Sequence, residues 1–219
     1  MTAVGLLATF LEGAPAPARL LLTRAGPVEN AAGVLYSHPG LPLAAAGREK
    51  LARLAAGLRG AGIERVYAAD SRAEAEAAKL IANLLQVDYR LEPALRERFW
   101  GAWEGLTFAE VRRRWPRELA AWQRDEAGFT PPGGESLRAV EERSLPLLRQ
   151  IRDHHAGKAA LVVGNCAVNR VALRLAWPFF PLAEGLRLEF NYAELSELRF
   201  YGDQGVLVRL NGAAVLESG

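Results

Sequence analysis

The chain has 219 residues, half of them hydrophobic, and its 27 Lys and Arg residues against 25 Asp and Glu residues leave a formal charge of +2. This length fits one large α/β domain or two very small ones, with enough apolar material for a substantial core. The small net charge excludes a strong electrostatic field for nucleic acid or a membrane surface, so neither is expected as a partner.

The N-terminal segment is predicted to be an extension, residues 1–17, ahead of a single domain over 18–219. Met1 to Leu11 is apolar but short, lacks a basic region and is followed by Glu12, so neither a signal peptide nor a membrane span is expected. Cys166 is the only cysteine, which rules out an intramolecular disulfide, argues against a cysteine zinc site and fits a reducing cytoplasm. No metal and no cofactor is predicted.

Strand-like and helix-like segments alternate along the domain. Buried strands are predicted at 19–23, 65–68 and 159–163, where short apolar runs end in turn residues. Helical periodicity predicts helices at 45–58, 73–85, 107–115, 117–124, 135–155 and 168–176. Residues 186–210 contain three extended stretches, broken near Asn191 and at 202–205, and predict hairpin-like strands at a sheet edge.

This alternation predicts a three-layer α/β/α fold with a mostly parallel central sheet. Ligands bind such sheets beyond the carboxyl ends of the strands. Three segments follow predicted strands and satisfy that rule: 24–30, 69–73 and 164–170.

Several short blocks occur in a recognisable order. They are Leu20–Gly26, Pro42-Leu43 with Gly47, Val66–Asp70, Leu95-Arg96-Glu97, Gly101–Thr107, Pro132–Ser136 and Ala160–Asn165. Their order and spacing resemble the histidine phosphatase (phosphoglycerate mutase-like) superfamily over about Leu20 to Leu216. The resemblance implies the phosphoglycerate mutase-like α/β fold.

The resemblance also implies a phosphoryl-transfer site with specific parts. One His attacks phosphorus, two Arg residues and a second His bind the phosphoryl oxygens, and a Glu protonates the leaving oxygen. Arg24 matches the first Arg and Glu97 matches the acid, whereas Ala25 replaces the nucleophile and Asn165 replaces the second His. Ala73 stands at the second Arg, although a local slip in the alignment would bring Arg72 there.

Residues predicted to bind phosphate or a phosphoester are therefore Arg24, Asn30, Asn165, Cys166 and Arg72. A pocket with one cation is expected. Arg24 could instead pair with a carboxylate at the sheet edge, and Glu97 could be a relic held by Arg24. Cys166 is interpreted as a small buried thiol, because the cysteine phosphatase spacing to an Arg is absent.

The remaining candidates have ordinary structural explanations. His38 is expected in a surface loop, and His154 and His155 at a solvated helix end. Trp100, Trp103, Trp115 and Trp122 are expected to pack in a core or lid, and an exposed subset would indicate a partner or homodimer surface.

The site residues favour a catalytically degenerate member of the family that lacks phosphohistidine chemistry and retains weak phosphoester binding or a protein-interaction role. One alternative is a phosphomonoesterase or mutase-type enzyme with an altered mechanism, in which Glu97 activates water and Arg24 binds phosphate. Another is a structural subunit paired with itself or with an active relative.

Overall fold

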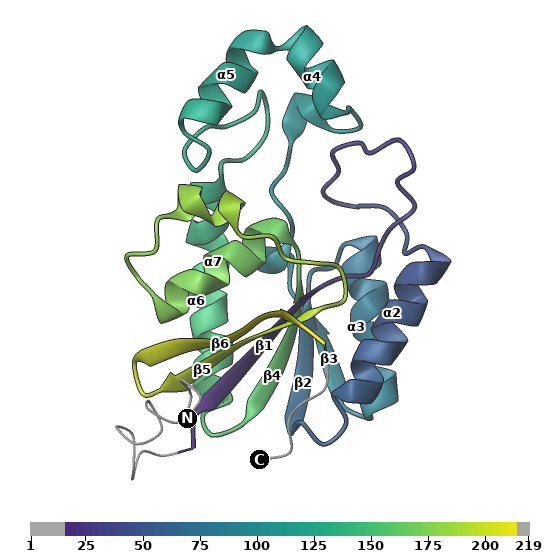
Figure 1. Cartoon of the computed structure of the whole chain (residues 1–219), viewed down its shortest axis with the longest axis vertical. Helices are drawn as coiled ribbons and strands as arrows, with labels where there is room; N and C mark the ends of the chain where they lie inside the picture. The colour runs from purple at the N-terminus through teal and green to yellow at the C-terminus, as the bar shows by residue number, and fades with distance from the viewer. Residues whose placement is uncertain (1–15, 214–219) are drawn as a thin grey trace.

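The computed structural model describes residues 16–213, apart from the side chains of 184–186, and contains a six-stranded sheet (Figure 1). The strands are β1 Ala18–Arg24, β2 Ile63–Ala68, β3 Asp88–Leu91, β4 Ala159–Gly164, β5 Leu195–Tyr201 and β6 Gln204–Gly212. Their order is β3-β2-β4-β1-β5-β6. The first four are parallel, and β5 and β6 are added antiparallel at one side.

Helices cover both faces of this sheet. The α-helices are α2 Ala45–Gly57, α3 Arg72–Leu85, α4 Phe108–Arg114, α5 Pro116–Arg124, α6 Leu137–His154 and α7 Cys166–Ala176. The part of the chain that the structure describes also has three short 3₁₀ helices, η1 Pro93–Leu95, η2 Gly101–Trp103 and η3 Leu182–Arg187. The mixed, mostly parallel sheet between helical layers confirms the predicted fold class.

The two faces follow from the alternation of side chains along each strand. Leu20 and Leu22 of β1 pack into the core cluster that contains α6 and α7, whereas Leu21 packs into the cluster that contains α2 and α3. All six residues of β4 are buried, as expected for a central parallel strand with helices on both sides.

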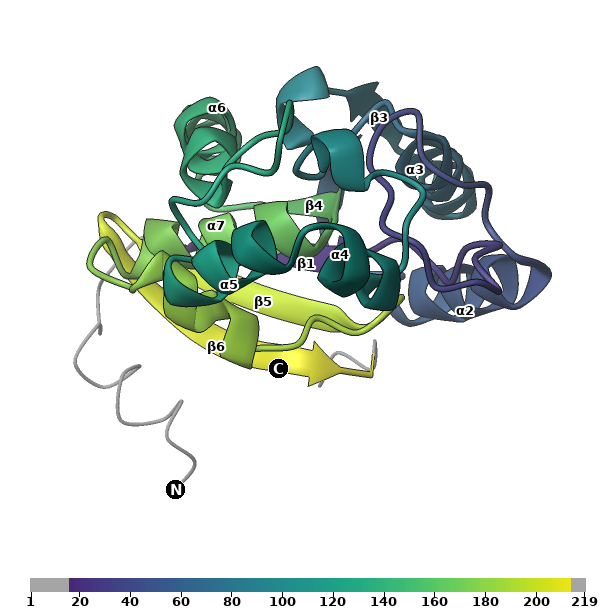
Figure 2. The ribbon, with the colours of Figure 1, turned by 90° about the horizontal axis from the view of Figure 1, so that it is seen from above.

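A small helical cap, residues 99–129 with η2, α4 and α5, lies beyond the carboxyl ends of β1 and β4 (Figures 1 and 2). Its interior is aromatic: Trp103 is fully buried, and Trp100, Trp115, Trp122 and Phe129 pack around it. Thr107 and Glu110 form a capping box at the start of α4. The tryptophans thus pack as a cap core, as the sequence predicts.

Differences from the sequence prediction are confined to edges and ends. Strand β3 was not predicted, because Asp-Tyr-Arg-Leu is a short, fully exposed edge strand without an apolar run. The tail forms two paired strands rather than three. The first predicted stretch begins within η3 and forms no strand, and an isolated bridge between Arg24 and Tyr192 precedes β5. The predicted extension, 1–17, falls almost wholly outside the described residues and stays a prediction.

Two glycines let the loop after β1 pack against α2. A Cβ atom on Gly47 would lie 2.4 Å from the carbonyl oxygen of Pro27, and one on Gly26 would lie 2.6 Å from the Cα atom of Gly47. The nearest atoms to both added Cβ positions are backbone atoms, so a change of side-chain rotamer cannot relieve the clash. The position of Ala25 at the end of β1 depends on this contact.

We predict that Gly47→Ala lowers the free energy of unfolding by about 1–3 kcal/mol, because the added methyl group displaces the loop. Urea denaturation measures this. Ala46→Ser, at an exposed position of the same helix, is the control and should change stability little. Equal stability of wild type and Gly47→Ala would contradict the tight-contact account.

Candidate functional site

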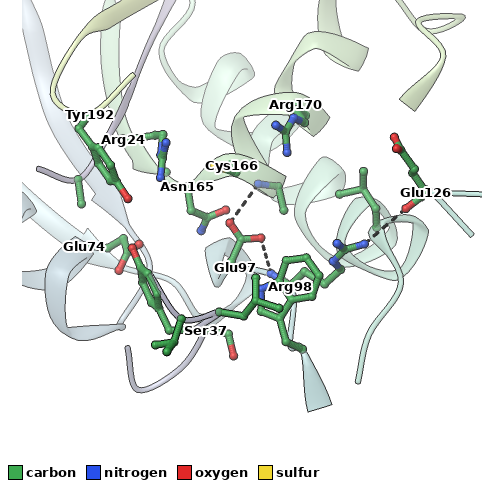
Figure 3. A pocket seen from close by; sticks show the side chains of 18 of the residues that line it. Arg24, Ser37, Glu74, Glu97, Arg98, Glu126, Asn165, Cys166, Arg170 and Tyr192 are labelled. Atoms are coloured by element: carbon green, nitrogen blue, oxygen red, sulfur yellow. Dashed lines mark hydrogen bonds between the residues drawn. The ribbon is translucent and has the colours of Figure 1, made fainter. Parts of the chain in front are cut away.

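A pocket of about 340 Å³ lies where β1 and β4 end, between the sheet and the cap (Figure 3). Its charged lining comes from elements far apart in the chain: Arg24, Arg98 and Arg170, and Glu74, Glu97 and Glu126. Its apolar wall includes Leu35, Trp100, Phe108, Trp122 and Leu137. The position at the strand ends is the one that the sequence predicts for a ligand.

Arg24 is the last residue of β1 and lies in this pocket. Its Nη1 donates to the carbonyl oxygen of Phe190 at 2.8 Å, and its guanidinium carbon lies 3.9 Å from the centre of the Tyr192 ring. These contacts fix the side chain by a carbonyl and a cation–π contact rather than by a carboxylate at the sheet edge. The charge is therefore directed into the pocket.

Glu97 also lies in the pocket, but Arg24 does not hold it. Its Oε1 accepts from the backbone N–H of Arg98 at 2.8 Å, and its Oε2 accepts from the N–H of Ala167 at 3.3 Å. Ala167 lies in the first turn of α7, where amide groups without intrahelical partners favour a carboxylate. Glu97 is thus positioned at the carboxyl end of β4 by backbone donors.

Asn165 and Cys166 start α7 at the same place. Asn165 is the N-cap: its Oδ1 accepts from the N–H of Val168 at 3.0 Å, and its Nδ2 donates to the carbonyl oxygen of Leu95 at 2.8 Å. Both ends of its side chain therefore support local structure, a role that the sequence prediction did not include. Burial raises the pKa of the Cys166 thiol, and the negative charge of Glu97 raises it further, so the thiol stays protonated at neutral pH.

Two predicted phosphate ligands do not line the pocket. Asn30 uses its side-chain amide to close a turn, with hydrogen bonds of 2.9 Å to the backbone N–H and carbonyl oxygen of Val34. Arg72 is exposed at the start of α3. Ala73 is buried in the core cluster that also contains Ala25 and does not line the pocket either, so neither candidate for the second Arg position contributes to the lining.

The expectation of a single cation is wrong, because Arg98 and Arg170 line the pocket with Arg24. The Arg98 guanidinium lies 4.0 Å from the centre of the Trp100 ring, and its Nη1 donates to the carbonyl oxygen of Glu126 at 3.4 Å. Helical spacing could have identified Arg170, which lies one turn beyond Cys166 on α7. Arg98 lies in the irregular segment between η1 and η2, so no periodicity indicated the direction of its side chain.

Glu74, like Arg98 and Arg170, lines the pocket but was not predicted from the sequence. It lies in the first turn of α3, lines the pocket and is 8 % exposed. Burial, opposed only in part by its own backbone amide, raises its pKa to about 7, and Glu97 adds to the rise while Arg24 opposes it. The site thus combines three guanidinium groups with one carboxyl group that is poorly solvated.

The three histidines of the chain lie outside the pocket lining. His38 lies near Ser71 and Asp70, with its Nδ1 3.4 Å from Ser71 Oγ. His155 is buried rather than solvated, contrary to the expectation for a helix end. Its ring nitrogens contact Tyr67 at 3.1 Å and Glu64 at 3.0 Å, and burial lowers its pKa.

Comparison with known proteins places the chain in a family. Residues 20–213 match the sequence profile of the histidine phosphatase superfamily, branch 1. The chain belongs to this superfamily. It is 36 % identical over 202 residues to the bifunctional protein Rv2228c of Mycobacterium tuberculosis, a match that covers 89 % of this chain and 53 % of that protein. The chain thus spans about half the length of this relative.

Other members are named as phosphatases. The chain is 31 % identical over 134 residues to glucosyl-3-phosphoglycerate phosphatase of Mycolicibacterium vanbaalenii, covering 61 % of this chain and 59 % of the relative. Among solved structures, Bacillus stearothermophilus YhfR superposes with a TM-score of 0.81 at 23 % identity, covering 90 % of this chain and 99 % of that one. The structural likeness supports the fold.

The described residues contain neither a cluster of metal-ligating side chains nor a membrane-spanning helix. Among the described side chains of 16–213, which exclude 184–186, no three His, Cys, Asp or Glu residues come together as candidate metal ligands. Within the same range, every helix is too short or too polar to cross a bilayer.

Proposed function

We propose that this protein binds phosphomonoesters in the pocket at the ends of β1 and β4 and does not form a phosphohistidine. It would be a degenerate member of the histidine phosphatase superfamily, as the sequence analysis predicts. A homodimer and a cytoplasmic location stay predictions.

One observation carries the proposal: Ala25, next to Arg24 in the pocket, stands where the resemblance implies the nucleophile. A methyl group cannot attack phosphorus, and none of the three histidines of the chain lies in the pocket lining. Asn165, which stands for the second His, already caps α7 and bonds Leu95. Phosphoryl transfer through a covalent histidine intermediate therefore lacks its first step.

The rest of the pocket supports binding. Three guanidinium groups line it, and guanidinium groups bind phosphate oxygens through directed, charge-assisted hydrogen bonds. Trp100, Phe108 and Trp122 supply an apolar wall beside them, and the volume of about 340 Å³ leaves room for an organic group as well as the phosphoryl group.

We predict that Arg24→Gln weakens the binding of phenyl phosphate by at least about tenfold, because it removes a charge fixed in the pocket. Isothermal titration calorimetry measures the affinity. Arg72→Gln is the matched control: Arg72 is exposed and lies outside the pocket lining, so its loss should leave the affinity unchanged. Equal weakening by both variants would indicate a different site or a general charge effect.

A second candidate function is a phosphomonoesterase that uses water directly. The phosphatase names of several relatives favour it. Here water would attack phosphorus, Glu97 would take its proton, and that proton would pass from Glu97 to the ester oxygen, which leaves as the alcohol. Release of phosphate that Glu97→Gln abolishes, with binding retained, would establish this function in place of the first.

A further inference from the structure

The buried carboxyl group of Glu74 lines the pocket beside the guanidinium groups, where a negative charge would oppose phosphate binding. Its side chain is 8 % exposed and faces the pocket, where Figure 3 shows it with Arg24, Glu97 and Tyr192. Its own backbone amide and the charge of Arg24 favour the ionised form, but no side chain of the described residues donates a hydrogen bond to it or forms an ion pair with it. An isolated carboxylate is costly to bury, so a group in this setting keeps its proton more readily.

The groups that face Glu74 come from several elements. Arg24 at the end of β1 favours its charged form, and Glu97 near α7 disfavours it. Tyr36, in the loop before α2, and Cys166 at the start of α7 also interact with it, and burial raises the pKa of both, so neither is charged at neutral pH. The balance of these groups leaves Glu74 close to its point of titration near neutral pH, at about 7.

We propose that Glu74 is a proton-carrying ligand of the pocket: in its neutral form it donates a hydrogen bond to a phosphoryl oxygen, and binding of the phosphoester takes up a proton from solvent. The proposal rests on the phosphoester-binding function. A carboxylate beside a phosphate dianion would repel it, whereas a carboxylic acid is a donor as well as neutral. Glu74 would then donate a hydrogen bond to the phosphoryl group, as a cationic side chain does, but only while it is protonated.

The test is calorimetric titration with phenyl phosphate in buffers of different ionisation enthalpy, from about pH 7 to about pH 8, where the ligand is already mostly dianionic. We expect the wild-type affinity to fall about fivefold over this range, with uptake of nearly one proton per ligand at the upper end. Glu74→Gln keeps a donor and cannot titrate, so its affinity should be independent of pH and its proton uptake close to zero. Glu74→Met removes the donor and should bind weakly at every pH.

The control is Glu76→Gln, on the same helix but paired with Arg48 outside the pocket, which should behave as wild type. Binding that is independent of pH in the wild type, or proton uptake that survives in Glu74→Gln, overturns the role of Glu74 and leaves the binding function intact. Failure of phenyl phosphate to bind at any pH overturns both. Circular dichroism confirms that each variant is folded.

Discussion

Ala25→His combined with Asn165→His is expected to turn a protein without phosphohistidine chemistry into one that releases phosphate from phenyl phosphate. The side chain at position 25 lines the pocket beside Arg24, and Glu97 is already held opposite by two backbone amides. Each single variant should do little, and the double variant should exceed either by at least about tenfold, because groups that act as one catalytic unit are strongly non-additive. A colorimetric phosphate assay measures this.

Asn165→His removes the N-cap of α7. The hydrogen bonds to Val168 and Leu95 are lost, and the free energy of unfolding should fall by about 1 kcal/mol, so folding has to be verified by circular dichroism. Adding Ala73→Arg, which would restore the second Arg that the family resemblance implies, should destabilise the fold, because Ala73 is buried in the apolar cluster with Ala25. A folded double variant with no turnover would show that the pocket has diverged beyond these positions.

Glu74→Gln is expected to stabilise the protein at about pH 8 by about 3 kcal/mol and to stabilise it by less than about 1 kcal/mol at about pH 5. Burial raises the pKa of Glu74 from 4.5 to about 7, so between these values the folded chain holds a proton that the unfolded chain releases. Stability of the wild type therefore falls as the pH rises through this window, and the full loss is reached above it. The neutral amide avoids this loss.

Urea denaturation of wild type and Glu74→Gln at the two pH values measures the difference. Glu76→Gln is again the control, since its carboxylate is paired with Arg48 at the surface and its removal should have a small effect at both pH values. A stability difference for Glu74→Gln that does not change with pH would mean that Glu74 is not protonated in the folded protein at neutral pH.

Apolar periodicity predicted most of the fold, because the central strands and the helices are buried on defined faces. Strand β4 is buried throughout, and α7 is buried except for the partly exposed stripe Cys166, Arg170 and Arg174, so both leave a clear pattern. Strand β3 leaves no such pattern, because all four of its residues are exposed and it is held by backbone pairing with β2. Pairing of this kind is invisible in one sequence.

The candidate site was predicted in part. Residues at the carboxyl ends of the central strands, such as Arg24 and Asn165, line the pocket as the strand-end rule predicts. Residues whose direction depends on tertiary packing could not be assigned: Arg98 is directed by its contact with Trp100, and Glu74 rather than Arg72 faces the pocket because of how α3 packs on the sheet.

Phosphorus-31 NMR of phenyl phosphate mixed with the wild-type protein tests the central claim most directly, because one spectrum reports binding and turnover together. We predict that the phenyl phosphate resonance shifts or broadens, that Arg24→Gln removes this effect, and that no inorganic phosphate resonance grows with time. Growth of that resonance at a rate proportional to protein concentration, abolished by Glu97→Gln, would contradict the account and identify a phosphomonoesterase. An unperturbed phenyl phosphate resonance at high protein concentration would contradict phosphoester binding itself.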